Sequence, residues 1–296
     1  MPAANPSTQT YWDRIYRGRP VTDFSGGSGC VSGATLSACC DPYYLHFVLR
    51  QIGDHWGDTH RGVTNYKTLL DDLEKWRLQS DERVCLVTFN YDTLLESALS
   101  AVRVTISAID DYTRNENYKV IKVHGSVNWG HELAIDVEDL MNRNVWEVVN
   151  EYIERAAELK FGDTYHVTSE YPIAWGMHHL GSRRVPLFPA IALPVVRKSK
   201  FECPSEHLRV LEESLPQVTK IITVGWRANE EHFLDLLRKK PARNARLMVV
   251  SRERSEAQEI CLKLSETGIG KDFHQAEGGF TGAILNGEIA YFLNRS

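Results

Sequence analysis

The sequence lacks the patterns that define several common classes of protein. Its six cysteines are scattered and none forms a Cys-x-x-Cys pair, which argues against a structural zinc site and a disulfide framework. No run approaches the roughly 18 apolar residues of a membrane span, and the polar segment Met1–Thr10 lacks the apolar core of a signal peptide. We therefore expect a cytoplasmic chain with reduced thiols, no membrane association and no bound metal.

An excess of positive charge is missing as well. The 296 residues carry 34 basic and 39 acidic side chains, which gives a net charge of −5 with histidine neutral. The basic runs Arg197–Lys200 and Arg238–Arg243 are short, and such runs are typical of a solvated surface or the C-terminal end of a helix. Because this charge balance gives no broad basic surface, we expect no nucleic-acid partner.

Short apolar runs alternate with amphipathic segments from Arg83 to the C-terminus. The runs are rich in valine and isoleucine and are largely unalternated, as in strands buried on both faces. We expect strands at Val84–Phe89, Val102–Ile109, Lys119–Val123, Leu187–Val196, Lys220–Val224 and Arg246–Val250. We expect helices at Thr93–Ala101, Glu206–Leu215, Glu230–Lys240, Ser255–Thr267 and near Thr281–Leu293. The alternation predicts an α/β fold with a Rossmann-like, mostly parallel sheet flanked by helices.

This α/β domain is expected to span residues 81–296. Helical periodicity within Tyr43–Ile52 and Tyr66–Leu78 predicts a mainly helical N-terminal region over residues 1–80. The sequence between 131 and 186 departs from the alternation, with a long helical stretch followed by irregular, aromatic-rich sequence. We interpret it as a helical and irregular insertion that forms a lid or wall beside the sheet.

Polar and glycine residues lie at the ends of several expected strands. In an open α/β sheet, ligands bind in the crevice outside the carboxyl ends of the strands. The strand-end residues are Thr88, Asn90, Asp92, His124, Gly125, Ser126, Gly225, Arg227 and Ser251. Their convergence on one edge of the sheet predicts a ligand site there.

Three of these residues have competing interpretations. Asp92 precedes Thr93 and Glu96, whose spacing is that of a capping box, so capping of the next helix explains Asp92 well. The amide of Asn90 both donates and accepts hydrogen bonds, and it lies before the cap. His124 is either a base in a pocket or a structural imidazole, and the sequence favours neither.

Two motifs are similar to those of a known family. The segments VTFNYDTLLE (Val87–Glu96) and KVHGSVNW (Lys122–Trp129) resemble the SIR2-like domain family, sirtuin relatives found in bacterial NAD-consuming and often antiphage proteins. Their Asn90 and His124 lie 34 residues apart (124 − 90). The segment Lys220–Leu237 resembles the family's late strand–glycine–helix unit.

The resemblance implies a function and roles for the strand-end residues. It implies that NAD⁺ is the substrate and that a hydrolase, an NADase, cleaves its nicotinamide–ribose bond. Asn90 and His124 match the family's catalytic asparagine and histidine. The resemblance assigns cofactor binding to Asn90 as well, and to the residues Thr88, Asp92, Gly125, Ser126, Gly225, Arg227 and Ser251. The zinc-binding cysteines of protein deacetylases are missing, which argues against deacetylation.

The sequence also departs from the family pattern. The family opens with a strand that leads into a Gly-Ala-Gly phosphate loop, but here the nearest candidate, Gly26–Gly29, follows the polar segment Arg17–Phe24. Arg227 replaces a small hydroxyl residue, and Ser251 stands where sirtuins carry asparagine. The alternatives are therefore a catalytically inactive relative that binds NAD⁺ or ADP-ribose, and a protein-interaction scaffold. A homo-oligomer or a partner protein is left open.

Overall fold

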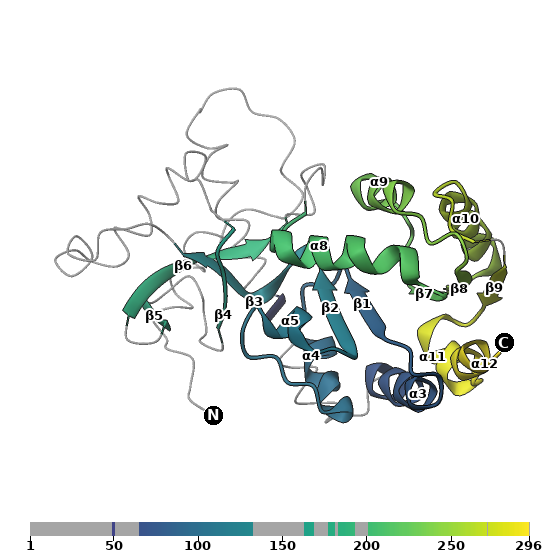
Figure 1. Ribbon diagram of the computed structural model, residues 1–296, viewed down its shortest axis with the longest axis horizontal. Coiled ribbons are helices and arrows are strands. Elements are labelled where there is room, and N and C mark those ends of the chain that lie inside the picture. The colour runs from purple at the N-terminus through teal and green to yellow at the C-terminus, as the bar shows by residue number, and fades with distance from the viewer. Residues whose placement is uncertain are drawn as a thin grey trace, which may run out of the picture.

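The protein is an α/β structure of parallel strands flanked by helices, as the computed structural model shows (Figure 1). The structure describes residues 49–50, 65–132, 163–168, 177–180, 183–192, 201–270 and 272–295. The expected fold class, consistent with a Rossmann-like sheet, is confirmed. Most of the N-terminal region expected over residues 1–80 lies outside these residues, and its longest described part is helix α3 (Asn65–Ser80).

The first parallel pair consists of β1 (Val84–Thr88) and β2 (Tyr118–Lys122), in register from Val84 opposite Tyr118 to Thr88 opposite Lys122. Helix α4 (Leu94–Leu99) and the short helix α5 (Asp111–Arg114) lie between them in sequence. Both strands match apolar runs of the sequence, so these two expectations are confirmed.

The strand expected at Val102–Ile109 is wrong. Val102 ends the 3₁₀ helix Ser100–Val102, and no strand is assigned to the residues that follow it. Arg103 adopts a left-handed conformation with φ of 59°. The Asp111 carboxylate then accepts hydrogen bonds from the backbone N–H groups of Ser107 and Ala108, at 2.9 Å each. These bonds hold the backbone in a turn, and the apolar side chains pack on the core from a loop.

A second parallel sheet has the order β7-β8-β9, from β7 (Lys220–Val224), β8 (Arg246–Val250) and β9 (Phe273–Ala276). Helices α9 (Glu231–Lys239) and α10 (Arg254–Ser265) connect these strands. The short strand β9 contains His274 and Gln275 and was not expected. The final expected helix is two helices, α11 (Gly279–Leu285) and α12 (Glu288–Asn294), because Gly287 between them has φ of +66°.

An antiparallel sheet with the order β4-β3-β6-β5 lies beside the parallel strands. Its strands are β3 (Gly125–Glu132), β4 (Tyr165–Val167), β5 (Met177–Leu180) and β6 (Arg183–Ile191). The strand expected at Leu187–Val196 is present over Leu187–Ile191 as part of β6, but the parallel orientation expected for it is wrong, because β6 starts at Arg183 and runs antiparallel to β3 and β5. The connection from β5 to β6 is too short for a parallel crossover. The long helix expected near 133–160 lies outside the described residues.

Successive residues of the parallel strands face two separate hydrophobic layers. Val120 and Met248 pack with α3, α4 and α12, whereas Ile121 and Leu247 pack with α8 (Ser205–Ser214), α9 and α10. Figure 1 shows α3, α11 and α12 grouped on one side of the parallel strands and α8 to α10 on the other. Both faces of the parallel strands are thus covered, as their apolar sequences predict. No helix among the described residues is long and apolar enough to cross a membrane.

Candidate functional site

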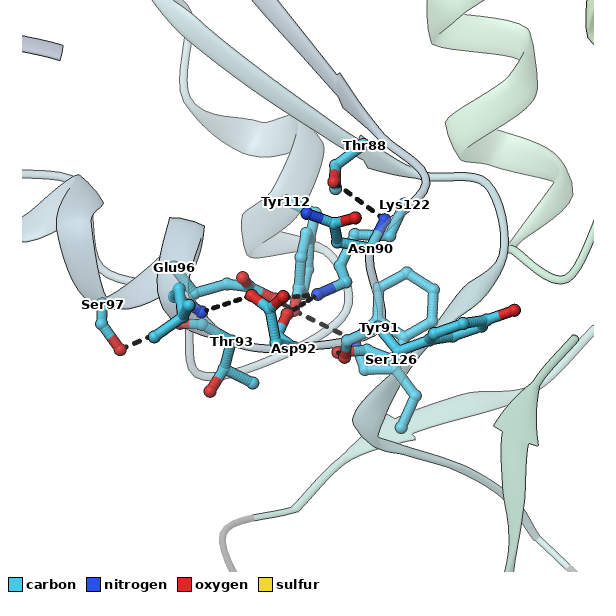
Figure 2. Close-up of polar contacts among 12 residues, drawn as sticks. Thr88, Asn90, Tyr91, Asp92, Thr93, Glu96, Ser97, Tyr112, Lys122 and Ser126 are labelled. Carbon is cyan, nitrogen blue, oxygen red and sulfur yellow. Dashed lines mark hydrogen bonds and ion pairs between the residues drawn. The ribbon is translucent and has the colours of Figure 1, made fainter. Parts of the chain in front are cut away.

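The corner after β1 brings Asn90 to the carboxyl edge of the sheet (Figure 2). The backbone N–H of Asn90 donates to the Thr88 hydroxyl at 3.1 Å, so these two site residues lie together. Its side-chain Nδ2 donates to the Tyr66 hydroxyl of α3, also at 3.1 Å. Asn90 is exposed, and it is positioned from both the strand and the helix.

Asp92 lies two residues before the start of helix α4. Its Oδ1 accepts a hydrogen bond from the backbone N–H of Leu94 at 3.0 Å, which satisfies a free donor of the first turn. Thr93, at the N-cap position, makes no side-chain capping bond, and the Glu96 carboxylate accepts a hydrogen bond from Lys122 instead. The capping box expected from the spacing of Thr93 and Glu96 is therefore wrong, and Asp92 does the capping alone.

A buried ion pair under this corner was not expected from the sequence. Lys122, fully buried at the end of β2, places its Nζ 2.8 Å from Oε1 of Glu96 and also donates to the Asp92 carbonyl (Figure 2). Tyr112 donates to the same Glu96 oxygen at 2.9 Å. Burial, with the nearby Glu96 charge, raises the pKa of Tyr112 well above its usual value, so its hydroxyl remains a donor. The signal of this ion pair in the sequence was Lys122, a charged residue near the end of an apolar run.

His124, two residues after the end of β2, is completely buried among aromatic rings. Its ring centroid lies 5.3 Å from that of Phe89, 6.3 Å from Tyr91 and 6.0 Å from His232. The backbone is fixed too, because the His124 carbonyl accepts a hydrogen bond from the N–H of Ala192 at 3.0 Å. The imidazole is thus held in a defined orientation behind the Asn90 corner.

The Gly125-Ser126 pair joins β3 to its neighbours. Gly125 has φ of +79°, and a Cβ there would lie 1.9 Å from the Ala190 carbonyl oxygen of β6. Ser126 is fully buried, and its hydroxyl donates to the Tyr91 carbonyl at 3.3 Å. Both residues have packing roles in the structure, and their binding of a ligand stays a prediction.

The candidates after β7 and β8 differ in their surroundings. Gly225 has φ of +64° and open space where a Cβ would lie. Arg227 is exposed, and its Nε donates to Glu256 at 3.0 Å. Ser251 is buried, and its hydroxyl donates to the Glu253 carbonyl at 2.6 Å at the start of α10.

A cavity of about 1440 Å³ lies between β1 and β7 and reaches this edge of the sheet. Thr88, Asn90, Gly225 and Arg227 all line it. His124 approaches it through Phe89, whose ring stacks on Trp226 at 5.1 Å between centroids. The structure therefore brings four candidates together on one cavity and sets His124 behind its aromatic wall.

Sequence reasoning missed several residues of this wall. Tyr66, Phe89, Trp226 and Glu230 line the cavity, and Trp226 Nε1 donates to Glu230 at 2.6 Å. Burial raises the pKa of Tyr66, with the Asp92 charge adding to it, and burial together with Glu230 raises the pKa of Tyr91 to about 12. Both hydroxyls are therefore protonated at neutral pH. Phe89 ends a predicted strand, but nothing in the sequence signalled the approach of Tyr66 from α3.

An α/β fold with polar side chains at the carboxyl ends of parallel strands is typical of proteins that bind a ligand in this crevice. Residues 84–167 match the family model of the SIR2-like domain, so the family resemblance is confirmed over this range. The match contains both Asn90 and His124, whereas Lys220–Leu237 lies beyond it. Proteins of this family are generally NAD-dependent enzymes, which indicates an NAD-related function. No curated protein matches the chain.

Metal-binding side chains do not gather within the part of the chain that the structure describes. No group of three or more His, Cys, Asp or Glu side chains there is arranged to hold a metal ion. His178 and His179 lie on β5, of which the structure describes the backbone. The expected absence of a metal stays a prediction.

Proposed function

We propose that this chain hydrolyses NAD⁺ at the nicotinamide–ribose bond and releases nicotinamide and ADP-ribose. The supporting observation is that the SIR2-like match contains two motifs whose Asn90 and His124 follow the adjacent parallel strands β1 and β2. The reaction needs no metal ion in this proposal, because nicotinamide departs as a neutral molecule from a cationic ring.

The chemistry divides between these two residues. The bond from the ribose C1′ to the ring nitrogen breaks, and its electron pair stays with nicotinamide. A water oxygen bonds to C1′, and the proton that it loses passes to the imidazole of His124 and then to solvent. Such a base contributes about 10²–10⁴-fold to the rate. The amide of Asn90 orients the water or a ribose hydroxyl, and orientation supplies much of the remaining acceleration.

Tyr66 supports this role of Asn90. The hydrogen bond from Asn90 Nδ2 to the Tyr66 hydroxyl restricts rotation of the amide, whose other polar atom is Oδ1. That oxygen is the acceptor that a water molecule or a ribose hydroxyl requires. Tyr66 is therefore a positioning residue in this proposal.

The burial of His124 adds a requirement. Its ring is 0% exposed, and the rings of Phe89 and Tyr91 contact it. In this proposal one of these two rings moves when NAD⁺ binds, and the ribose then reaches the imidazole. Closure of the rings over the bound ribose would exclude bulk water from the reacting carbon.

The direct test is nicotinamide release from NAD⁺ by the purified chain and its variants. Asn90→Ala and His124→Ala are expected to reduce release by at least 100-fold, as for the loss of a positioning group or a base. Asn286→Ala and His274→Ala are matched controls outside the site and should retain the wild-type rate. A folded wild-type chain that releases no nicotinamide contradicts the proposal.

The second candidate is an inactive relative that binds NAD⁺ or ADP-ribose. The observation that favours it is the complete burial of His124 behind Phe89. Calorimetric binding of NAD⁺, with the ligand recovered intact, would select this function. A protein-interaction scaffold that binds no nucleotide would give no heat of binding with either ligand.

The family resemblance also suggests a cellular role. We propose that the protein acts in the cytoplasm in antiphage defence, as a homo-oligomer or with a partner protein. NAD⁺ concentrations in infected cells that express the wild-type chain should fall, and those in cells that express His124→Ala should not. Unchanged NAD⁺ in both cell lines would count against this role.

A further inference from the structure

Three polar side chains meet on the antiparallel sheet, and none of them lines the cavity between β1 and β7. His131 of β3 and Tyr165 of β4 are opposite each other in the register of these strands, with ring centroids 4.4 Å apart. Glu202 follows β6 in the sequence. Its Oε1 lies 2.8 Å from His131 Nε2 and accepts a hydrogen bond from the Tyr165 hydroxyl at 3.2 Å.

Both rings donate to the Glu202 carboxylate. Burial, with the nearby Glu202 charge, raises the pKa of Tyr165 well above its usual value, so its hydroxyl remains a donor. Since a carboxylate oxygen only accepts, Nε2 of His131 carries the proton of the shorter bond. The ladder between β3 and β4 fixes the two rings through the backbone and does not involve Glu202. The pair of rings is therefore a platform that holds the Glu202 side chain.

The backbone of Glu202 contacts the chain at His124. Its N–H donates to the carbonyl of Val123 at 3.0 Å, and Glu202 pairs with His124 in an isolated parallel bridge. The His124 carbonyl accepts the N–H of Ala192, the residue after β6. The backbone around His124 is thus held by two segments, and Glu202 anchors one of them to the antiparallel sheet.

The residue before Glu202 contributes to the aromatic enclosure of His124. The ring centroid of Phe201 lies 4.6 Å from that of His232 and 6.5 Å from that of Phe233. His232 lies 6.0 Å from His124, and Phe233 lies 5.2 Å from Phe89. Phe89 closes the circuit at 5.3 Å from His124. A shift of the segment that contains Phe201 would therefore change the ring contacts of the imidazole as well as its backbone.

We propose that Glu202 is a positioning residue for His124, because its carboxylate, held by His131 and Tyr165, fixes the backbone from which the imidazole projects. Its effect on the rate rests on the proposed function, in which His124 is the base, whereas its effect on the position of the ring does not. A base transfers a proton only within hydrogen-bond reach, so a small displacement of the ring lowers the rate. Glu202 needs no contact with NAD⁺ in this role.

Three variants isolate the contribution of the carboxylate. Glu202→Ala removes it, and Glu202→Gln keeps an oxygen that can accept the same two hydrogen bonds. Glu132→Ala is the matched control, since the side chains of Glu132 and Glu202 are both 29% exposed. The Glu132 carboxylate lies 3.3 Å from Nε2 of His166, so the control also removes a glutamate–histidine pair from the same sheet.

Hydrogen exchange and the NMR signals of the His124 ring test the proposal in the intact chain without NAD⁺. In Glu202→Ala the amide of residue 202 should exchange at least about tenfold faster, as for the loss of hydrogen bonds to a charged group. The His124 ring signals should shift and broaden in the same variant. Glu202→Gln and Glu132→Ala should remain close to the wild type. Unchanged His124 signals in folded Glu202→Ala, or the same change in Glu132→Ala, would overturn the proposal.

Steady-state nicotinamide release gives the second measurement. Glu202→Ala should lower kcat at least about tenfold with KM nearly unchanged, and Glu202→Gln should restore most of the rate. Tyr165→Phe removes one of the two donors and should have a smaller effect of the same kind, and it replaces Glu202→Ala in both measurements if that variant does not fold. Equal kcat values for Glu202→Ala and Glu132→Ala would overturn the proposal.

The two measurements separate failure of this inference from failure of the proposed function. A wild-type chain that releases no nicotinamide contradicts the hydrolase alone, because the His124 signals still decide whether Glu202 positions the ring. Nicotinamide release with the same kcat in all the variants contradicts the role of Glu202 and leaves the hydrolase standing.

Discussion

The side-chain amide of Asn90 donates a hydrogen bond to the Tyr66 hydroxyl at 3.1 Å and so connects the carboxyl end of β1 to the first turn of α3. Tyr66→Phe removes this acceptor and keeps the ring. A hydrogen bond contributes about 0.5–1.5 kcal/mol, which corresponds to a change in rate of about 2- to 12-fold. We expect kcat for nicotinamide release to fall by this factor with KM nearly unchanged. A rise in KM alone would show that Tyr66 contributes to binding instead.

The buried pair of Lys122 and Glu96 makes the corner sensitive to the loss of either charge. Lys122→Met leaves the Glu96 carboxylate buried without its cation, and such a loss costs about 3–5 kcal/mol. Urea unfolding should show this decrease. The double variant Lys122→Met/Glu96→Leu should recover part of the stability, because no buried charge remains. A single variant as stable as the wild type would contradict this assignment of the pair.

Gly125 is required by the closeness of β6. Gly125→Ala places a Cβ 1.9 Å from the Ala190 carbonyl oxygen and also strains a backbone with φ of +79°. Gly287→Ala is the matched control, because it has φ of +66° and open space around the Cβ position. The control should lose only the conformational part, about 1–2 kcal/mol, and Gly125→Ala should lose clearly more in the same denaturant titration. Equal losses would show that β6 moves aside.

The pH dependence of stability should depend on Glu74. Hydrogen bonds from Arg77, at 2.8 and 2.9 Å, lower the pKa of Glu74 from its usual 4.5 to about 2, and the Tyr118 hydroxyl bonds to the same carboxylate. A lowered pKa in the folded state means that Glu74 stabilises the fold fully above about pH 4.5 and loses this contribution as the pH falls toward 2.

Unfolding titrations across this range give the measurement. Glu74→Gln should be less stable than the wild type at neutral pH, and its stability should decline less between pH 4.5 and 2. The exposed Glu259 provides the control, since Glu259→Gln should leave the shape of the pH profile unchanged. Parallel profiles for Glu74→Gln and the wild type would contradict the prediction.

The local sequence pattern predicted the parallel strands and the helices that pack on them. The apolar runs at β1, β2, β7 and β8 lie between helices on both faces, and their composition alone identifies them. Strand β3 escaped prediction because its sequence mixes glycine, histidine and asparagine with apolar residues. Its partner β6 lies far along the chain, and no local pattern encodes that pairing.

The candidate site was predictable only in part for the same reason. Asn90 and His124 were identified by their positions after strands and by the family motifs that contain them. The contact of Tyr66 with Asn90 joins residues 24 positions apart, and the ring of Trp226 reaches Phe89 from another sheet. Such contacts follow from tertiary packing, which leaves no periodic signal in the sequence.

Tyr91, between Asn90 and Asp92, connects the corner to the antiparallel sheet by two hydrogen bonds. Its hydroxyl donates to the Ala192 carbonyl after β6 at 2.6 Å, and its own carbonyl accepts the N–H of Val127 in β3 at 2.9 Å. The antiparallel sheet therefore holds the backbone of Tyr91, which lies next to Asn90, in place. The position of the Asn90 corner therefore depends on the antiparallel sheet as well as on β1, because a displacement of β3 or β6 would break or strain the two Tyr91 bonds.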